Sequence, residues 1–254
     1  MTGLKEQLRA GKQVLGTMVT TFTTVDLAKV LKESGFDFMM IDCEHGAFTT
    51  REVANHISVA RSIAFPALVR IPEMRREHAL KYLEMGANGL LLPNTESAEE
   101  AAYLVECSKY APAGKRGVSL SRPHTDFKKV NKADYMEKAN RETLLMVQIE
   151  SKKGVENIDE ILAVPGIDVG FIGPNDMSQD YGILGQYSHP EIVAAFEKIM
   201  KTAEKYKIYS GVHFGHAEPL RPWIKRGMQI NMWNSDLGLF SLGAAQQKEL
   251  RPER

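Results

Sequence analysis

The sequence predicts a single α/β domain in which eight strand–helix units close into a (β/α)8 TIM barrel. Short apolar runs alternate with helical patterns along almost the whole chain, which is typical of parallel strands joined by helices. There are eight such runs, and one barrel commonly fills a length near the 254 residues found here. Acids, a histidine and an arginine follow several runs directly, as at the mouth of a barrel enzyme.

Eight apolar runs are expected to form the strands. They cover residues 14–19, 38–42, 67–71, 89–93, 144–150, 169–173, 210–214 and 229–234. Parallel strands of this kind are joined by right-handed crossovers. Eight units favour closure into a barrel, although an open doubly wound sheet stays an alternative on strand count alone.

Helical patterns fill the segments between these strands. They cover residues 24–34, 51–64, 76–85, 97–109, 154–162, 190–206 and 218–226. Thr50 and Ser97 are expected to cap two of the helices, since acids follow each of them in the first turn. Glycines are expected to end four helices, at positions 35, 86, 166 and 227.

Two segments interrupt or follow this alternation within one domain spanning residues 1–254. Residues 111–141 are rich in Pro, Gly, Ser and Lys, and we expect a long loop there that serves as a lid or an oligomer contact. Residues 246–254 are polar and are expected to form a loose C-terminal tail.

Composition argues against several classes of partner. Lysine plus arginine equals aspartate plus glutamate, at 32 each, so no nucleic acid or acidic membrane partner is expected. No apolar run reaches a membrane-spanning length, and the N-terminal residues lack the apolar core of a signal peptide. With two cysteines, the chain has no disulfide framework. We therefore expect a cytoplasmic protein.

Two carboxylates at neighbouring strand ends are candidate metal ligands. Gln148 and Glu150 lie two residues apart, so both side chains point to the same face of their strand, and Asp176 follows the next strand. Such a pair suits a hard cation such as Mg²⁺ or Mn²⁺, with water and substrate oxygens completing the site. Helix capping or ion pairing would explain the same acids without a metal.

The segment Gly173-Pro174-Asn175-Asp176 is a candidate anion-binding turn. The glycine permits close approach of a ligand, and the amides that follow lead into a helix and can receive a carboxylate or phosphate. Arg70 ends the third strand, where its guanidinium can bind a carboxylate or enolate oxygen, or form a structural ion pair.

His45 has the best context for proton transfer among seven histidines, because it follows Asp42 and Glu44 at a strand end. His213 and His216 follow the seventh strand and can also face the site, whereas His56 looks like a surface or helix position. Strand alternation turns Cys43 away from Asp42 and Glu44, so a nucleophilic role for it is disfavoured.

Two alternative chemistries lack their signatures. None of the eight expected strands ends in a lysine that could form a Schiff base. No glycine fingerprint for a dinucleotide follows the first strand.

At these residues the chain resembles the HpcH/HpaI aldolase family, metal-dependent aldolases of 4-hydroxy-2-oxo acids in the phosphoenolpyruvate/pyruvate barrel superfamily. The resemblance covers about residues 4–244. The motifs that carry it are 35–37 (GFD), 41–46 (IDCEHG), 69–70 (VR), 86–87 (GA), 92–93 (LP), 116–118 (RGV), 148–150 (QIE) and 171–178 (FIGPNDMS).

The resemblance implies a role for each candidate residue. Glu150 and Asp176 would hold Mg²⁺, Mn²⁺ or Co²⁺, and Gln148 would contact the 2-oxo acid, whose carboxylate would lie against Gly173, Pro174, Asn175 and Asp176. His45 would transfer a proton at the 4-hydroxyl, and Arg70 would stabilise the enolate oxygen. Cleavage would give pyruvate and an aldehyde through a metal-stabilised pyruvate enolate, within sugar-acid or aromatic-compound catabolism. Asp42 and Glu44 would support these groups.

The resemblance also implies a homo-oligomer, a dimer or hexamer, with the eighth helix exchanged between subunits. Glu84 occupies the position of an aspartate that orients the histidine in the family, and its extra methylene departs from that pattern. The segment 119–124 and the residues after the seventh strand also depart from it, which affects the aldehyde half of the substrate. The alternatives are an acyl-CoA lyase of the same superfamily and a barrel that binds keto acids without turnover.

Overall fold

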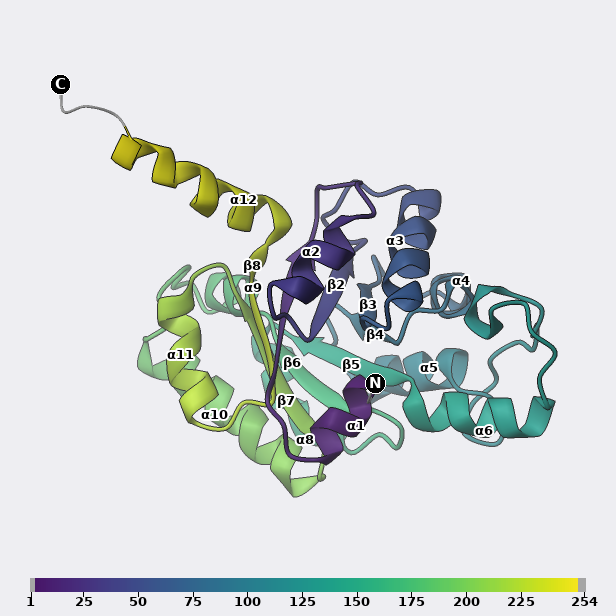
Figure 1. Ribbon diagram of the computed structural model, residues 1–254. Coiled ribbons are helices and arrows are strands. Elements are labelled where there is room, and N and C mark those ends of the chain that lie inside the picture. The colour runs from purple at the N-terminus through teal and green to yellow at the C-terminus, as the bar shows by residue number, and fades with distance from the viewer. Residues whose placement is uncertain (1–2, 251–254) are drawn as a thin grey trace.

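The computed structural model describes residues 3–250 and shows a closed barrel of eight parallel strands surrounded by helices (Figure 1). Each strand pairs with the next, and β8 closes the barrel on β1. The strands are β1 (Val14–Val19), β2 (Phe38–Asp42), β3 (Ala67–Arg70), β4 (Gly89–Leu92), β5 (Leu144–Ile149), β6 (Val169–Ile172), β7 (Tyr209–Phe214) and β8 (Ile230–Ser235). The predicted barrel is confirmed, and every strand end lies within one residue of its expected place.

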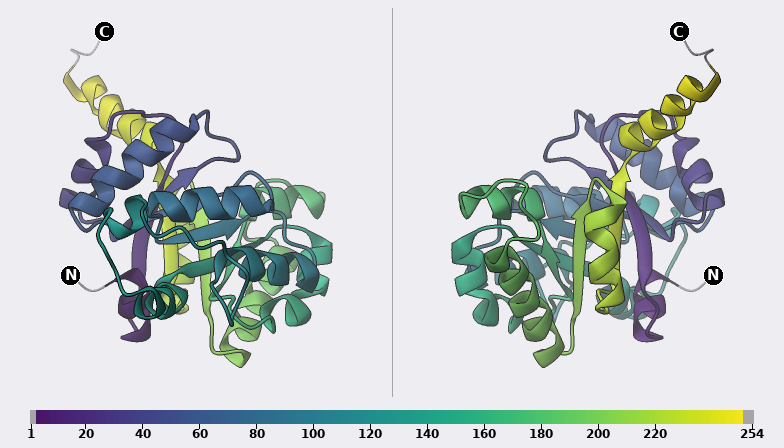
Figure 2. Two further views of the ribbon diagram at one scale, coloured as in Figure 1. Left: turned by 90° about the vertical axis from the view of Figure 1, so that its right-hand side faces the viewer. Right: turned by 90° about the vertical axis from the view of Figure 1, so that its left-hand side faces the viewer.

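Helices cover the outside of the barrel, as the two side views show (Figure 2). They are α1 (Leu4–Arg9), α2 (Leu27–Glu33), α3 (Thr50–Ser62), α4 (Arg76–Met85), α5 (Ala98–Ser108), η1 (Pro123–Thr125), α6 (Lys132–Glu142), α7 (Lys152–Glu156), α8 (Ile158–Leu162), α9 (Pro174–Asp180), α10 (Pro190–Lys205), α11 (Ala217–Lys225), α12 (Asp236–Ala245) and η2 (Gln246–Leu250). The helix expected at 154–162 is two short helices that meet at Asn157. Thr49 rather than Thr50 caps α3, in a capping box with Glu52.

The continuous loop expected at 111–141 is wrong, because this segment contains η1 and all but the last residue of α6. The Asn131 side chain caps α6 by accepting hydrogen bonds from the amides of Ala133 and Asp134. No residue of α6 is fully buried. The helix therefore lacks the strong apolar stripe from which an amphipathic helix is predicted. In the expected tail, residues 246–250 form η2, and 251–254 lie outside the described residues.

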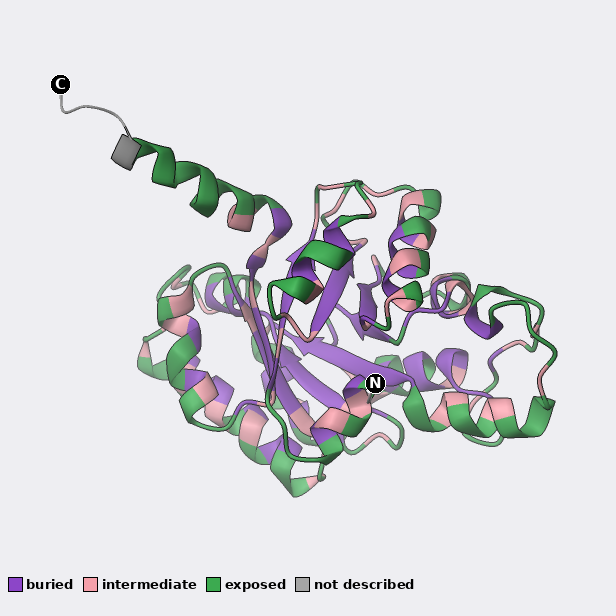
Figure 3. Cartoon of the chain, in the orientation of Figure 1, coloured by how far each residue is buried: buried purple, intermediate pink, exposed green. Residues whose placement is uncertain are grey.

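Two apolar layers form the core. The barrel interior is filled by large side chains from alternate strand positions, and Leu4 and Leu8 of α1 pack against this interior cluster where it meets the start of the strands. A second, larger cluster lies between the strands and the surrounding helices. Figure 3 shows most of the strand residues buried, and many of the surrounding helices buried on one side and exposed on the other.

Side chains two residues apart on a strand point to the same side, so residues at the mouth of the barrel follow the direction of interior residues before them. Met40 and Leu68 belong to the interior cluster, so Asp42 and Arg70, two residues further on, also point inward. Met146 belongs to it as well, which turns Gln148 and Glu150 inward. Phe171 of β6 brings Gly173 to the same side. The packing of the barrel interior thus directs these polar side chains toward the barrel axis at the carboxyl ends of the strands.

α12 leaves the barrel instead of packing along it (Figure 1). Its apolar residues Leu237, Phe240 and Leu242 are 45%, 62% and 51% exposed. Among residues 3–250, no helix has the length and apolar character needed to cross a membrane.

Candidate active site

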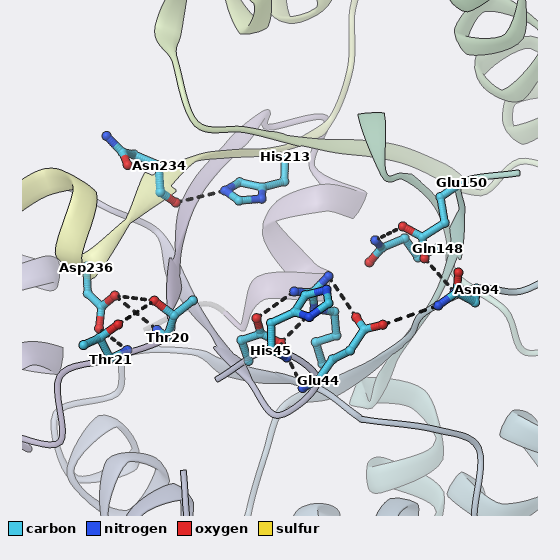
Figure 4. A network of polar contacts seen from close by, with 12 residues as sticks. Thr20, Thr21, Glu44, His45, Asn94, Gln148, Glu150, His213, Asn234 and Asp236 are labelled. Carbon is cyan, nitrogen blue, oxygen red and sulfur yellow. Dashed lines mark hydrogen bonds and ion pairs between the residues drawn. The ribbon is translucent and has the colours of Figure 1, made fainter. Parts of the chain in front are cut away.

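A pocket of about 250 Å³ opens at the carboxyl ends of the strands. Its lining includes eight of the residues singled out in the sequence: Asp42, His45, Arg70, Gln148, Gly173, Pro174, Asn175 and Asp176. Met18, Thr20, Phe171, Ile172, His213 and Ser235 complete the lining. Figure 4 shows how several of these side chains converge with Glu44, Asn94 and Glu150.

Arg70 is held by two acids from β2 and the turn after it. Its Nε and Nη2 donate to the two carboxylate oxygens of Asp42, at 2.9 and 2.6 Å. Its Nη1 lies 3.0 Å from Glu44 Oε2. Asp42 also accepts from the Glu44 amide at 3.0 Å, so the same carboxylate fixes both the arginine and the turn. The planar guanidinium is therefore fixed in direction at the mouth.

Glu150 is buried, with 4% of its surface exposed, and no cation contacts its carboxylate within residues 3–250. Oε1 accepts a hydrogen bond of 2.7 Å from the Asn94 amide, and Oε2 accepts one from the Gln148 side-chain amide. Burial raises the pKa of Glu150 to about 7, these two hydrogen bonds oppose the rise, and the charges of Asp176 and Glu44 add to it.

Asp176 lies in the first turn of α9, near enough to Glu150 for its charge to raise the pKa of that carboxyl. Pro174 occupies the first helical turn, where its missing N–H and fixed φ suit a helix start. Gly173 lies between Pro174 and β6, and a Cβ built on it would come within 2.1 Å of Glu150 Oε2 and 2.7 Å of Gln148 Nε2. Only glycine therefore leaves room for the Glu150 carboxylate at this point.

Two histidines lie at the pocket from different sides (Figure 4). His45 is exposed, and its amide is 3.4 Å from Asp42 Oδ1. The Nε2 of His213 is 3.0 Å from the carbonyl oxygen of Asn234, so Nε2 carries the hydrogen. Burial lowers the pKa of His213, which favours its neutral form. Of these two histidines, both of which line the pocket, His45 is the more exposed to solvent.

Glu84 lies elsewhere. It is the penultimate residue of α4, at the end of the barrel opposite the strand carboxyl ends. Its carboxylate is 3.8 Å from Arg122 Nε, and its carbonyl oxygen is 3.1 Å from His124 Nδ1. Within one chain, therefore, Glu84 does not orient His45.

Two further expectations concern residues near the site. His56 lies on α3, so of the two expected positions, surface or helix, the helix is confirmed, and its side chain is fully buried at 0% exposed. Cys43 packs against the outer core, and burial raises the pKa of its thiol to about 11. A neutral, half-buried thiol is a poor nucleophile, in line with the low weight that the sequence gives to a nucleophilic role.

Sequence reasoning missed Asn94 and Asp236. Asn94 acts on Glu150 through its backbone amide, an interaction that leaves no side-chain signature, although its φ of 48° marks a special turn. Asp236 accepts from the amides of Thr20, Thr21, Phe22 and Leu237, and thereby ties the end of β8 to the loop after β1. An aspartate at a strand–helix junction was the available signal.

The donor set fits a divalent cation only if non-protein ligands complete it. Within the described part of the chain, no group of three or more His, Cys, Asp or Glu side chains is arranged to hold a metal. Glu150 and Asp176 supply two carboxylates, and the buried Gln148 Oε1 has no hydrogen-bond partner among residues 3–250. Hard oxygen ligands of this number suit Mg²⁺ or Mn²⁺, which retain water and substrate oxygens.

Fold and site together define a β/α-barrel enzyme with an acidic, oxygen-rich centre at the strand carboxyl ends. The family model for HpcH/HpaI aldolase/citrate lyase matches residues 20–242. The chain belongs to this family, and the family resemblance in the sequence is confirmed.

Similar proteins agree with the assignment. The chain is 33% identical to a 5-keto-4-deoxy-D-glucarate aldolase of Klebsiella pneumoniae over 212 residues, covering 84% of this chain and 82% of that one. An HpcH/HpaI aldolase from Desulfitobacterium hafniense superposes with a TM-score of 0.94 at 38% identity, covering 98% and 96% of the two chains. A citrate synthase, SbnG, superposes with a TM-score of 0.86 at 26% identity, covering 99% and 100%. These similarities support an aldolase-type lyase.

Proposed function

We propose that this protein is a divalent-metal-dependent aldolase that cleaves or forms 4-hydroxy-2-oxo acids, giving pyruvate and an aldehyde. The observation that carries the proposal is the buried Glu150 carboxylate beside Asp176. Its carboxylate lies against Gln148 and Gly173, which line the pocket, and has no cationic partner among the described residues, whereas Asp42 pairs with Arg70. A bound Mg²⁺ or Mn²⁺ would supply the missing positive charge and Lewis-acid stabilisation of the enolate.

Residues of the chain itself would bind the substrate, stabilise the enolate oxygen and transfer the proton. Gln148 and the start of α9 bind and orient the 2-oxo acid, since an N-terminal helical turn accepts a carboxylate. The N–H groups of Arg70 that Asp42 and Glu44 do not occupy face charge developing on the 2-oxo oxygen. His45 takes the proton from the 4-hydroxyl and returns it in the reverse reaction.

The aldehyde half is proposed to be a short, hydroxylated sugar-acid fragment. The relatives named 5-keto-4-deoxy-D-glucarate aldolase support this choice. The pocket of about 250 Å³ admits only a small substrate, and Thr20, His213 and Ser235 add polar groups to its lining.

The test is pyruvate release from a panel of 4-hydroxy-2-oxo acids, coupled to lactate dehydrogenase. EDTA should abolish release, Mg²⁺ or Mn²⁺ should restore it, and Glu150→Ala should lack it. Activity that survives complete metal removal would contradict the mechanism. Metal and pyruvate binding without cleavage of any panel member would favour the non-catalytic barrel, and cleavage confined to acyl-CoA substrates would favour the lyase.

We also propose that α12 docks on a second copy of this chain. A groove of about 490 Å³ lies beside β1, α2 and the start of α12, with a mainly apolar lining that includes Leu27, Leu31 and Trp233. Leu239 and Phe240 of α12 form part of this lining, and Leu237 and Leu242 of the same helix are exposed apolar side chains available to a second copy. Exchange of the helix between two subunits would bury both surfaces, and the resemblance supports a dimer or hexamer.

A further inference from the structure

A second polar cavity, of about 340 Å³, lies at the opposite end of the barrel from the pocket described above. It is open to solvent on one side and is bordered by the C-terminal ends of α3 and α4, by η1, by α6 and by the residues that precede β4 and β5. None of its lining residues belongs to the lining of the candidate active site.

Arg116 lines this cavity and is buried, with 6% of its surface exposed. Its Nε and Nη2 have no hydrogen-bond partner among residues 3–250, and no carboxylate forms an ion pair with it there. Its Cζ lies 4.6 Å from the centre of the Tyr110 ring, a contact that orients the guanidinium without neutralising it. A buried and unpaired guanidinium is costly, so an anionic partner is expected.

The carboxylates near Arg116 form their ion pairs with other cations, although the charge of Glu84 also acts on Arg116. Asp126 pairs with Arg61 at 3.0 Å, and Glu142 lies 4.0 Å from Lys138. Glu84, next to the cavity, is 3.8 Å from Arg122. The lining therefore has one cation more than it has acids, and Arg116 is that cation.

His124 adds a hydrogen-bond acceptor to the same cavity. Its Nδ1 is 3.1 Å from the carbonyl oxygen of Glu84, so Nδ1 must carry the hydrogen. In the neutral ring, which burial favours by lowering the pKa of His124, Nε2 is then an acceptor. Nε2 is buried and has no partner among the described residues. The cavity thus lacks both an anion for Arg116 and an O–H for His124.

We propose that this cavity binds a small oxyanion that still carries a proton, with hydrogen phosphate as its best-fitting ligand. The phosphate oxygens would accept from Arg116 Nε and Nη2, and the P–OH group would donate to His124 Nε2. Sulfate and simple carboxylates provide the acceptors but lack the O–H at neutral pH, so they fit less well. This site is independent of the proposed aldolase chemistry.

The first test uses the whole protein treated with EDTA, so that phosphate cannot bind through a metal at the barrel mouth. Melting temperature is compared in phosphate, sulfate and chloride at equal ionic strength and pH, and calorimetric titration gives the affinity for phosphate. We expect phosphate to raise the melting temperature by about 2 to 4 °C over chloride, and sulfate to raise it less. No rise over chloride would overturn the proposal, including the case in which a carboxylate of a second copy neutralises Arg116.

Variants then locate the effect. Arg116→Met should abolish the phosphate-induced rise, while the melting temperature in chloride stays the same or increases because an unpaired buried charge is removed. His124→Asn keeps a donor for Glu84 and should make phosphate no better than sulfate. Arg226→Met is the matched control, since Arg226 also stacks on an aromatic ring at 4.6 Å but pairs with Glu197 at 3.0 Å. Retention of the full rise in Arg116→Met would place phosphate elsewhere and contradict the proposal; if that variant does not fold, the wild-type titration against sulfate decides.

Discussion

Buried acids at the mouth of this barrel are compensated in different ways. Asp42, 1% exposed, has the two-point contact with Arg70. Asp236, 2% exposed, accepts from four backbone amides, which lower its pKa although burial opposes them. Glu150 has one amide and one neutral side chain, and its pKa rises to about 7. Of these three acids, Glu150 is the one without a cation or several amide donors among residues 3–250, which is why we propose it as a metal ligand.

At the residue scale, Arg70→Met should destabilise the protein strongly. It leaves Asp42 buried and unpaired, and removal of one partner of a buried ion pair costs about 3–5 kcal/mol. Arg70→Lys should cost less, because a charge remains although the two-point contact is lost. Urea denaturation measures both changes.

The control is Arg226→Met, which breaks a pair whose side chains are 47% and 45% exposed. Such surface pairs contribute about 0–1 kcal/mol. If Arg70→Met lowered the free energy of unfolding no more than this control, Asp42 would not depend on Arg70 as described.

At the scale of elements, the junction between β6 and α9 shapes the site. Gly173→Ala should reduce aldolase activity at least about tenfold, because its Cβ would displace the Glu150 carboxylate by its close approach of 2.1 Å. Gly170→Ala in the same strand is the matched change, since its Cβ would meet Leu162 at 3.0 Å on the helix side. It should lower stability and leave kcat nearly unchanged. Full activity in Gly173→Ala would show that the carboxylate does not need its present position.

A buried lysine joins α5 to α6 and makes stability depend on pH. Lys109 Nζ donates to the carbonyl oxygens of Asn140 and Thr143, at 2.8 and 2.7 Å. Burial lowers the pKa of Lys109 from 10.5 to about 8. Below pH 8 the amine is charged in both states, and its burial lowers the free energy of unfolding by the full penalty. As the pH rises from about 8 toward the unfolded pKa of 10.5, the folded protein loses this proton first and the penalty is relieved.

Relative to Lys109→Met, wild-type protein should gain about 2 kcal/mol of stability between about pH 7 and about pH 9.5. Chemical denaturation of both proteins at several pH values measures the difference, in which titrations common to both cancel. A difference independent of pH would mean that Lys109 keeps its ordinary pKa.

Sequence patterns predicted the elements that have a clear apolar run or stripe of their own. They missed features that depend on contacts with other parts of the chain. Runs such as 38–42 and 169–173 located the strands because a strand of a parallel barrel is apolar on both faces. The sequence did not reveal α6 because most of its residues are polar and none is fully buried, so it has no strong apolar stripe. The role of Asn94 was not predicted, because it donates a hydrogen bond to Glu150 through its backbone amide. Alternation placed Gln148 and Glu150 on one face of their strand, whereas the pairing of Arg70 with Asp42 depends on the register of β2 against β3, which the sequence does not show.

At the scale of the whole molecule, α12 and the groove beside it predict a mass in solution above the 28.4 kDa of one chain. Phe240→Asp should shift the protein toward the monomer, because Phe240 is 62% exposed on the projecting helix. Leu184→Asp, at a residue 64% exposed away from the groove, should leave the mass unchanged. Size-exclusion chromatography with light scattering measures all three. A monomeric wild-type protein would contradict exchange of α12.

The central claim is that metal at Glu150 and Asp176 stabilises charge on a pyruvate-derived enolate, whatever the aldehyde. Exchange of the pyruvate methyl protons with deuterium oxide, followed by proton NMR, tests it without a 4-hydroxy substrate. The account predicts exchange with Mg²⁺ or Mn²⁺, its loss with EDTA, and its loss in Glu150→Gln, a variant that should remain folded because the buried charge is removed. Exchange that persists in EDTA, or in Glu150→Gln with metal present, would contradict the account.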